Sequence, residues 1–184
     1  ENVNKPFKLP LELHLLLNNS STYRETSYKY LRFTGYRGSY IHCFDQLLTQ
    51  NYLELTQEEL EDMWKKQFDS LTDNDFYELK TGLISVAFET KENYINYCKE
   101  NLCELNEVLL LETIPKILGI NFWTFIIQRK ILGVNETYSI VYPQGYDIRR
   151  LYNHTRAPEF ACLIYKYTNS KNQEIYERVE QSIE

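Results

Sequence analysis

Hydrophobic residues recur at helical spacing through the first two thirds of the chain. Thr56-Gln57-Glu58-Glu59 has the pattern of a capping box and predicts the start of a helix. The apolar face expected for this helix comprises Leu60, Met63, Trp64, Phe68 and Leu71. Asp75 and Thr90 are the expected N-caps of two further helices.

Residues 105–118 predict another helix, with a break or kink near Pro115 and an end at Gly119. After Gly119 the helical spacing gives way to continuous apolar and β-branched runs, which are typical of buried strands. The expected strands are 120–127, 137–142 and 160–167.

The C-terminal residues 170–183 return to a four-residue spacing. Ile175, Val179 and Ile183 predict a narrow apolar stripe on a last helix, opened by a weak capping box at Ser170. Helices first and strands late predict an α+β fold, with a small mixed sheet between helices.

The length of 184 residues is that of one domain. We therefore expect a single domain over 1–184, with a core at about 24–168, a lead-in segment at 1–23 and a C-terminal helix at 169–184. No apolar stretch reaches the ~18 residues of a membrane span, and the first residues lack a signal-peptide pattern.

Charge and cysteine content exclude some classes of function. The net charge of −6 disfavours binding to a nucleic-acid backbone. The four cysteines have no zinc-type spacing, so we expect neither a metal site nor a cofactor. Three of the four cysteines lie in apolar runs, where a free thiol behaves as a small hydrophobic side chain. This favours a reducing compartment, so an intracellular protein, cytoplasmic or nuclear, is expected.

The stretch "GYRGSYIHCFDQLL", residues 35–48, has the outline of a nucleophile turn. A glycine-containing loop and a small polar residue precede apolar residues at helical spacing. Ser39 is the expected N-cap of that helix, over residues 39–50.

This stretch resembles the nucleophile motif G-D-G-N-C-L-F-R-A-[LI] of the ovarian tumour (OTU) family of cysteine deubiquitinases. Residues 92–126 are similar to the family's short helix, tight turn, apolar helix ending L-G-[VI] and following strand. "PEFACLIYKY", residues 158–167, is similar to the family's final H-[YF]-x-[SA]-L strand. The three matches keep the family order over residues 30–167, which implies the OTU-like variant of the papain-like cysteine protease fold.

The family's catalytic residues are missing from the aligned positions. Ser39 stands where the nucleophilic cysteine would be, and Tyr36 stands where the oxyanion loop has aspartate. Glu159 replaces the general-base histidine, and Ala161 replaces the residue that orients it. A serine without an imidazole partner has no ready route to a nucleophile at neutral pH.

The resemblance therefore implies a catalytically inactive pseudo-deubiquitinase that serves as a protein-binding or scaffolding module. The expected partner is a protein, of which ubiquitin and ubiquitin-like proteins are the implied class. The segment 170–183 is a second candidate contact, to a partner or to another copy of the chain, unless its apolar stripe docks on the domain itself.

Two alternatives remain open. In an active, atypical cysteine deubiquitinase, Cys43 is the nucleophile, beside His42 or with His154 as base. In an RNA-associated regulatory domain, binding is salt-dependent. The simpler interpretations are a helix-face role for His42, a surface-loop position for His154 and a solvated acidic face over 58–62.

Overall fold

The structure, a computed structural model, describes residues 6–8, 10, 31–49, 55–141 and 160–183. Contacts group these residues into two compact units. A sheet unit holds the described parts of 1–38, 125–141 and 162–184, and a helical unit holds those of 39–124 and 142–161. Both units contain non-consecutive segments, so the expectation of a single domain stays a prediction.

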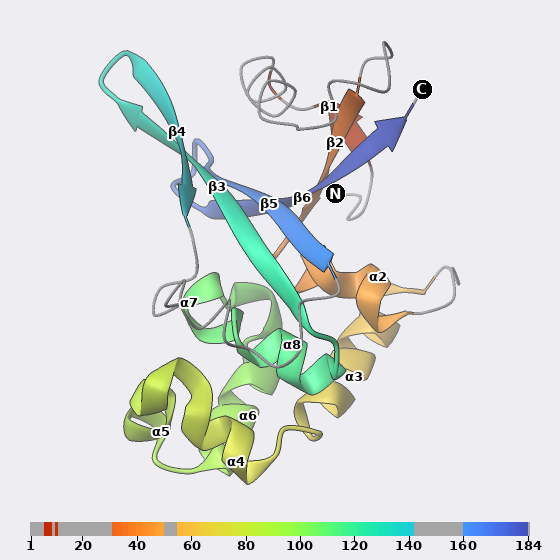
Figure 1. Cartoon of the computed structure of the whole chain (residues 1–184), viewed down its shortest axis with the longest axis vertical. Coiled ribbons are helices and arrows are strands. Elements are labelled where there is room, and N and C mark those ends of the chain that lie inside the picture. The colour runs from red at the N-terminus through yellow and green to blue at the C-terminus, as the bar shows by residue number, and fades with distance from the viewer. Residues whose placement is uncertain (1–5, 9, 11–30, 50–54, 142–159, 184) are drawn as a thin grey trace. The chain divides into compact units, whose positions relative to one another are not determined.

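The sheet unit is built on a six-stranded sheet within the described residues (Figure 1). Its strands are β1 (Pro6–Lys8), β2 (Leu31–Gly38), β3 (Phe122–Leu132), β4 (Asn135–Val141), β5 (Phe160–Thr168) and β6 (Glu174–Ile183). Their order is β1-β2-β6-β5-β3-β4. β2 pairs antiparallel with β1 and β6, as do β3 with β4 and β5 with β6.

The strands expected at 120–127, 137–142 and 160–167 are confirmed as β3, β4 and β5. β3 continues to Leu132, where a two-residue turn of Gly133 and Val134 connects it to β4. Gly133 has φ of 65°, a conformation that hairpin turns of this length require and that glycine adopts without strain. Ile127, Tyr165 and Val179 form a buried apolar cluster in this unit.

The helix expected over 170–183 is wrong, because Glu174–Ile183 is the strand β6. A spacing of four residues fits one helix face, but it is also even and therefore fits one strand face. Glu177 obscured the alternation of that strand. It is buried, and its carboxylate accepts a 2.6 Å hydrogen bond from the Tyr167 hydroxyl.

The proposed cap at Ser170 is also wrong, since residues 169–173 form the turn between β5 and β6. The Asn169 side chain accepts hydrogen bonds from the backbone N–H groups of Lys171 and Gln173. β6 lies between β2 and β5 in the sheet, so this segment does not form the amphipathic helix expected of a partner contact. Contact of the segment with a partner or another copy stays a prediction.

The helical unit contains short helices (Figure 1). The α-helices are α2 (Asp45–Leu48), α3 (Gln57–Phe68), α4 (Asp73–Glu78), α5 (Leu83–Phe88), α6 (Lys91–Glu100), α7 (Glu107–Leu110) and α8 (Thr113–Leu118). Three 3-10 helices accompany them in the described residues: η1 (Ile41–Phe44), η2 (Leu79–Gly82) and η3 (Leu102–Glu104). None of the helices in these described ranges has the length and apolar character needed to cross a membrane.

Of the three caps predicted between residues 56 and 90, two are confirmed and one is wrong. Thr56 and Glu59 form the capping box of α3, and the Thr90 side chain caps α6. Asp75 is not a cap: it lies within α4 and donates its backbone N–H to the Thr72 side chain. Thr72 and Asp75 are both good capping residues, and the helix begins at the earlier one.

The helix expected over 105–118 is divided into α7 and α8. The break falls at Leu111 and Glu112, before Pro115, which lies in the first turn of α8. Proline is tolerated there because first-turn N–H groups have no partner within the helix. Gly119 ends α8 in a left-handed conformation, as predicted. The packing of this segment against the sheet stays a prediction.

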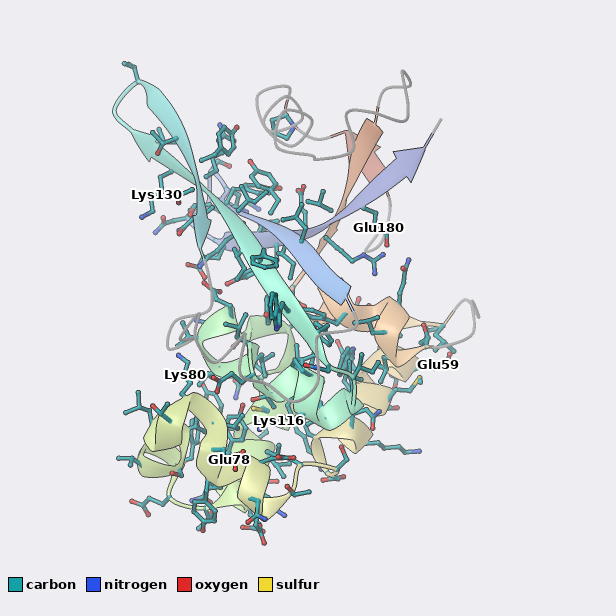
Figure 2. The ribbon with its side chains drawn as sticks, in the orientation of Figure 1. Glu59, Glu78, Lys80, Lys116, Lys130 and Glu180 are labelled. Carbon is teal, nitrogen blue, oxygen red and sulfur yellow. The ribbon has the colours of Figure 1, made fainter. Side chains whose placement is uncertain are left out.

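The core of the helical unit is formed where α3 contacts α6 and α8. Trp64, Phe68, Phe76 and Tyr94 are fully buried within it. Lys116 on α8 lies 3.5 Å from the carboxylates of both Asp75 and Glu78 on α4 (Figure 2). These pairs are partly exposed, so the shape of the unit depends mainly on its aromatic core.

Candidate functional site

The segment that resembles a nucleophile turn has a different local structure from the one expected. Residues 35–38 do not form a glycine-rich loop, because they are the last residues of strand β2. In the strand register, Tyr36 is paired with Pro6 on one side and Arg178 on the other. The backbone at the position of the expected oxyanion loop is therefore committed to sheet hydrogen bonds.

Ser39 follows the strand directly, and its role as an N-cap is wrong. The first helical turn is the 3-10 helix η1, whose N-cap is Tyr40, without a side-chain capping bond. The Ser39 carbonyl accepts the His42 N–H at 3.1 Å, while the buried Ser39 hydroxyl has no hydrogen-bond partner among the described residues. No base is positioned to activate this hydroxyl in the described part of the chain.

Cys43, the alternative nucleophile, is buried in η1. Its thiol lies 3.6 Å from the Ser39 carbonyl oxygen, to which it donates. Buried thiols in such surroundings are poor nucleophiles. His154, the base proposed for Cys43, lies outside the described residues, as does Glu159, which stands at the family's base position; of Ala161 only its backbone in β5 is described. Catalysis by Cys43 therefore stays a prediction.

His42, next to Cys43, has an ordered environment that does not include the Cys43 thiol. Its Nδ1 lies 2.9 Å from Asp45 Oδ2, one helical turn further along. The Trp64 indole N–H donates to Asp45 Oδ1 at 2.8 Å. All three side chains are buried, so Asp45 holds the imidazole ring in one orientation and Trp64 holds Asp45.

The other ring nitrogen of His42, Nε2, lies near Cys103, which belongs to the 3-10 helix η3 of the helical unit. Cys103 Sγ is 3.7 Å from His42 Nε2 and 3.3 Å from Glu61 Oε1, to which it donates. Cys103 is exposed and Glu61 half-buried, so solvent reaches this end of the cluster. The ligand atoms of His42, Glu61 and Cys103 all lie within 4.8 Å of one another.

The charges in the cluster favour a protonated imidazole and a neutral thiol. Burial lowers the pKa of His42, but the hydrogen bond and charge of Asp45, aided by Glu61, raise it overall. Burial, followed by the hydrogen bond and charge of Glu61, raises the pKa of Cys103 to about 11. Two carboxylates beside one imidazole leave the cluster rich in negative charge.

This arrangement is compatible with two kinds of chemistry. The Cys103 thiol, the His42 imidazole and the Asp45 carboxylate are arranged as a nucleophile, a base and the residue that orients the base. The extra carboxylate of Glu61 works against a thiolate but adds an anionic ligand for a cation. Within the described residues, this is the one group of three side chains suited to metal binding.

Local sequence patterns do not mark most of the cluster around His42. His42 was expected on a helix face and Glu61 on a solvated acidic face. The His42-x-x-Asp45 spacing is the one local signal, because positions three apart share a helix face. Glu61 and Cys103 are separated by 42 residues, and no local spacing pattern marks such a pair.

Comparison with known proteins adds no relative: no family model, no curated protein and no solved structure matches the chain. The site must therefore be interpreted from its own geometry.

Proposed function

We propose that the chain is a non-catalytic, OTU-like module that binds a protein partner. One observation carries the proposal: at the position aligned with the family nucleophile, Ser39 has a buried hydroxyl without a hydrogen-bond partner in the described residues. A hydroxyl becomes a nucleophile only when a base accepts its proton. Among the described residues, the aligned position therefore lacks the base that OTU chemistry requires.

The order of elements gives the family resemblance further support. The segment aligned with the family's middle motif contains a short helix, a turn, an apolar helical segment ended by Gly119, and a strand. The same order is expected from the resemblance. By the same reasoning we propose that the protein acts inside the cell, in the cytoplasm or nucleus.

Exposed apolar side chains on the helical unit supply a candidate binding surface. Tyr77, Leu83, Val86 and Tyr97 are exposed, and they come from α4, α5 and α6, which adjoin one another. Apolar side chains gathered on a surface mark protein contacts more often than isolated ones do. We propose ubiquitin or a ubiquitin-like protein as the partner, on the basis of the family resemblance.

The proposal is tested by adding di-ubiquitin of several linkages to the full chain and measuring cleavage and binding together. We expect binding without cleavage. Val86→Asp, at a position that is 79% exposed on α5, should weaken binding at least about tenfold. Val134→Asp, at the β3–β4 turn, where Val134 is 99% exposed, is the matched control and should leave binding unchanged. Cleavage, or equal binding by both variants, contradicts the proposal.

A second candidate function is a cysteine hydrolase in which Cys103, His42 and Asp45 form the catalytic triad. The 3.7 Å distance between Cys103 Sγ and His42 Nε2 favours it over catalysis by Cys43. Cleavage that Cys103→Ala abolishes and Cys43→Ala preserves would establish this function. An RNA-associated role is the least supported alternative, because the chain carries a net charge of −6.

A further inference from the structure

The distances between the exposed ends of His42, Glu61 and Cys103 are close to those of a metal-binding site. In a tetrahedral zinc site, ligand atoms at ordinary bond lengths lie roughly 3.4 to 3.6 Å apart. Cys103 Sγ is 3.7 Å from His42 Nε2 and 3.3 Å from Glu61 Oε1. The third pair of ligand atoms is within 4.8 Å, so a small rotation of the half-buried Glu61 side chain completes the set.

The hydrogen bonds behind His42 are also those of a metal ligand. A metal-binding histidine usually donates its other ring N–H to a carboxylate, which sets the tautomer and directs the lone pair at the metal. His42 has this partner in Asp45, at 2.9 Å from Nδ1. Trp64 in turn fixes Asp45 by a 2.8 Å hydrogen bond. This support is already formed among buried side chains.

The charges of Cys103 and Glu61 and the exposure of Cys103 also favour metal binding. A divalent cation between a thiolate and a carboxylate is neutralised, and its charge removes the repulsion between these two groups. Cys103 is exposed, so an ion can enter from solvent. The protons that binding displaces from the Cys103 thiol and from Nε2 of a protonated His42 can leave to solvent by the same path. A cluster closed on all sides would offer no such path.

We propose that His42 Nε2, Cys103 Sγ and a Glu61 carboxylate oxygen together bind one divalent thiophilic cation of the zinc class. No fourth His, Cys, Asp or Glu joins the group within the described residues, so the remaining position is open to water. Sites with three protein ligands and one water are the type in which zinc activates the water or binds a further ligand. The inference is independent of the proposed protein-binding function.

The test uses the full chain, stripped of metal with a chelator and titrated with cobalt(II) and then with zinc(II). We expect about one cobalt ion to bind and to produce a thiolate-to-cobalt charge-transfer band in the near ultraviolet. Zinc should displace the cobalt and abolish the band. A zinc-dependent rise in melting temperature should accompany binding, because the ion binds the folded state alone.

Variants at the solvent side of the cluster decide whether these side chains are the ligands. Cys103→Ser should remove the charge-transfer band, and Glu61→Gln should weaken zinc binding at least about tenfold. The matched controls are Glu104→Gln, an exposed carboxylate next to Cys103, and Cys162→Ser, a thiol of the sheet unit. Both controls should bind as the unaltered chain does.

Three results would overturn the proposal. These are the absence of a thiolate band, a band that persists in Cys103→Ser, and equal zinc affinity in Glu61→Gln and Glu104→Gln. If His42→Gln fails to fold, the Cys103 and Glu61 variants still decide, because neither residue lies in the buried core. The variants contain no test of protein binding, so this proposal and the proposed function can fail separately.

Discussion

Ser39 and Thr56 are two residues that sequence patterns mark equally well as helix caps, but only Thr56 is one. Replacing a true cap by alanine costs about 1 kcal/mol of stability. Ser39→Ala should cost nothing and stabilise by up to about 1 kcal/mol, because it removes a buried hydroxyl that has no partner among the described residues. Thr56→Ala is the comparison and should destabilise. Urea unfolding of both variants checks this, and a loss in Ser39→Ala equal to that in Thr56→Ala would contradict it.

Asp45 receives hydrogen-bond donors from residues that are far apart in the sequence. The Trp64 indole N–H reaches it across 19 positions, from α3. A hydrogen bond to a charged, buried acceptor contributes about 1.5 to 3 kcal/mol. We therefore expect Trp64→Phe and Asp45→Ala to show a coupling free energy of about 1 to 3 kcal/mol in a double-mutant cycle.

The control cycle pairs Trp64→Phe with Ser70→Ala, whose hydroxyl bonds to the carbonyls of Gln67 and Ile117 and not to Trp64. Those two changes should add within about 0.5 kcal/mol. Additivity of the Asp45 pair to the same degree would show that Trp64 does not hold the carboxylate.

At the scale of the element, α6 carries two buried side chains that can lose a proton at high pH, Cys98 and Tyr94. They make the stability of the helical unit sensitive to alkali. Burial raises the pKa of the Cys98 thiol to about 12, from an ordinary 9.0, and burial also raises the pKa of Tyr94. A raised pKa means that the folded state keeps a proton that the unfolded state releases. The stabilisation is complete below pH 9 and is lost as the pH rises toward 12.

We expect the free energy of unfolding to fall by up to about 1.4 kcal/mol per pH unit for Cys98 between pH 9 and 12. Both tryptophans, Trp64 and Trp123, lie in the helical unit, so tryptophan fluorescence during urea unfolding measures this fall. Cys98→Ala should flatten the slope. Ile95→Ala, a buried change on the same helix, should lower stability and leave the slope unchanged. Equal slopes in both variants would refute the assignment.

Strand β6 carries a prediction about the sheet. It lies between β2 and β5, so its removal separates the β1–β2 pair from the rest of the sheet. Deleting residues 170–184 should therefore abolish slow hydrogen exchange in β3 and β5. The control is a Gly-Ser insertion after Gly133, in the exposed β3–β4 turn, which should leave exchange unchanged. Unchanged protection in the truncated chain would mean that β6 is dispensable.

At the scale of the whole molecule, strands of the same sheet differ in how far sequence patterns could predict them. Strands β3 to β5 were predictable because their apolar runs are continuous. β6 was not, since Glu177 occupies a buried position and Tyr167, on another strand, satisfies it. A polar residue buried by a tertiary contact has no local signature.

The candidate site was unpredictable for the same physical reason. His42 and Asp45 are neighbours on one helical turn, and their spacing is visible in the sequence. Trp64, Glu61 and Cys103 join them only because α3 and η3 fold back on η1 and α2. The family resemblance places the candidate site at Ser39, whereas the polar contacts of the cluster begin three residues later, at His42.

We propose that the chain has an OTU-like order of elements and no cysteine-peptidase chemistry. The most direct test of this claim is incubation of the full chain with ubiquitin bearing a thiol-reactive electrophile at its C-terminus, followed by intact-mass measurement. An active OTU enzyme, run alongside, should be labelled completely. We expect no adduct of the chain, because Cys43 is buried and the Cys103 thiol is bound to Glu61. An adduct mapped to Cys43 or to Cys103 would contradict the claim and identify the nucleophile.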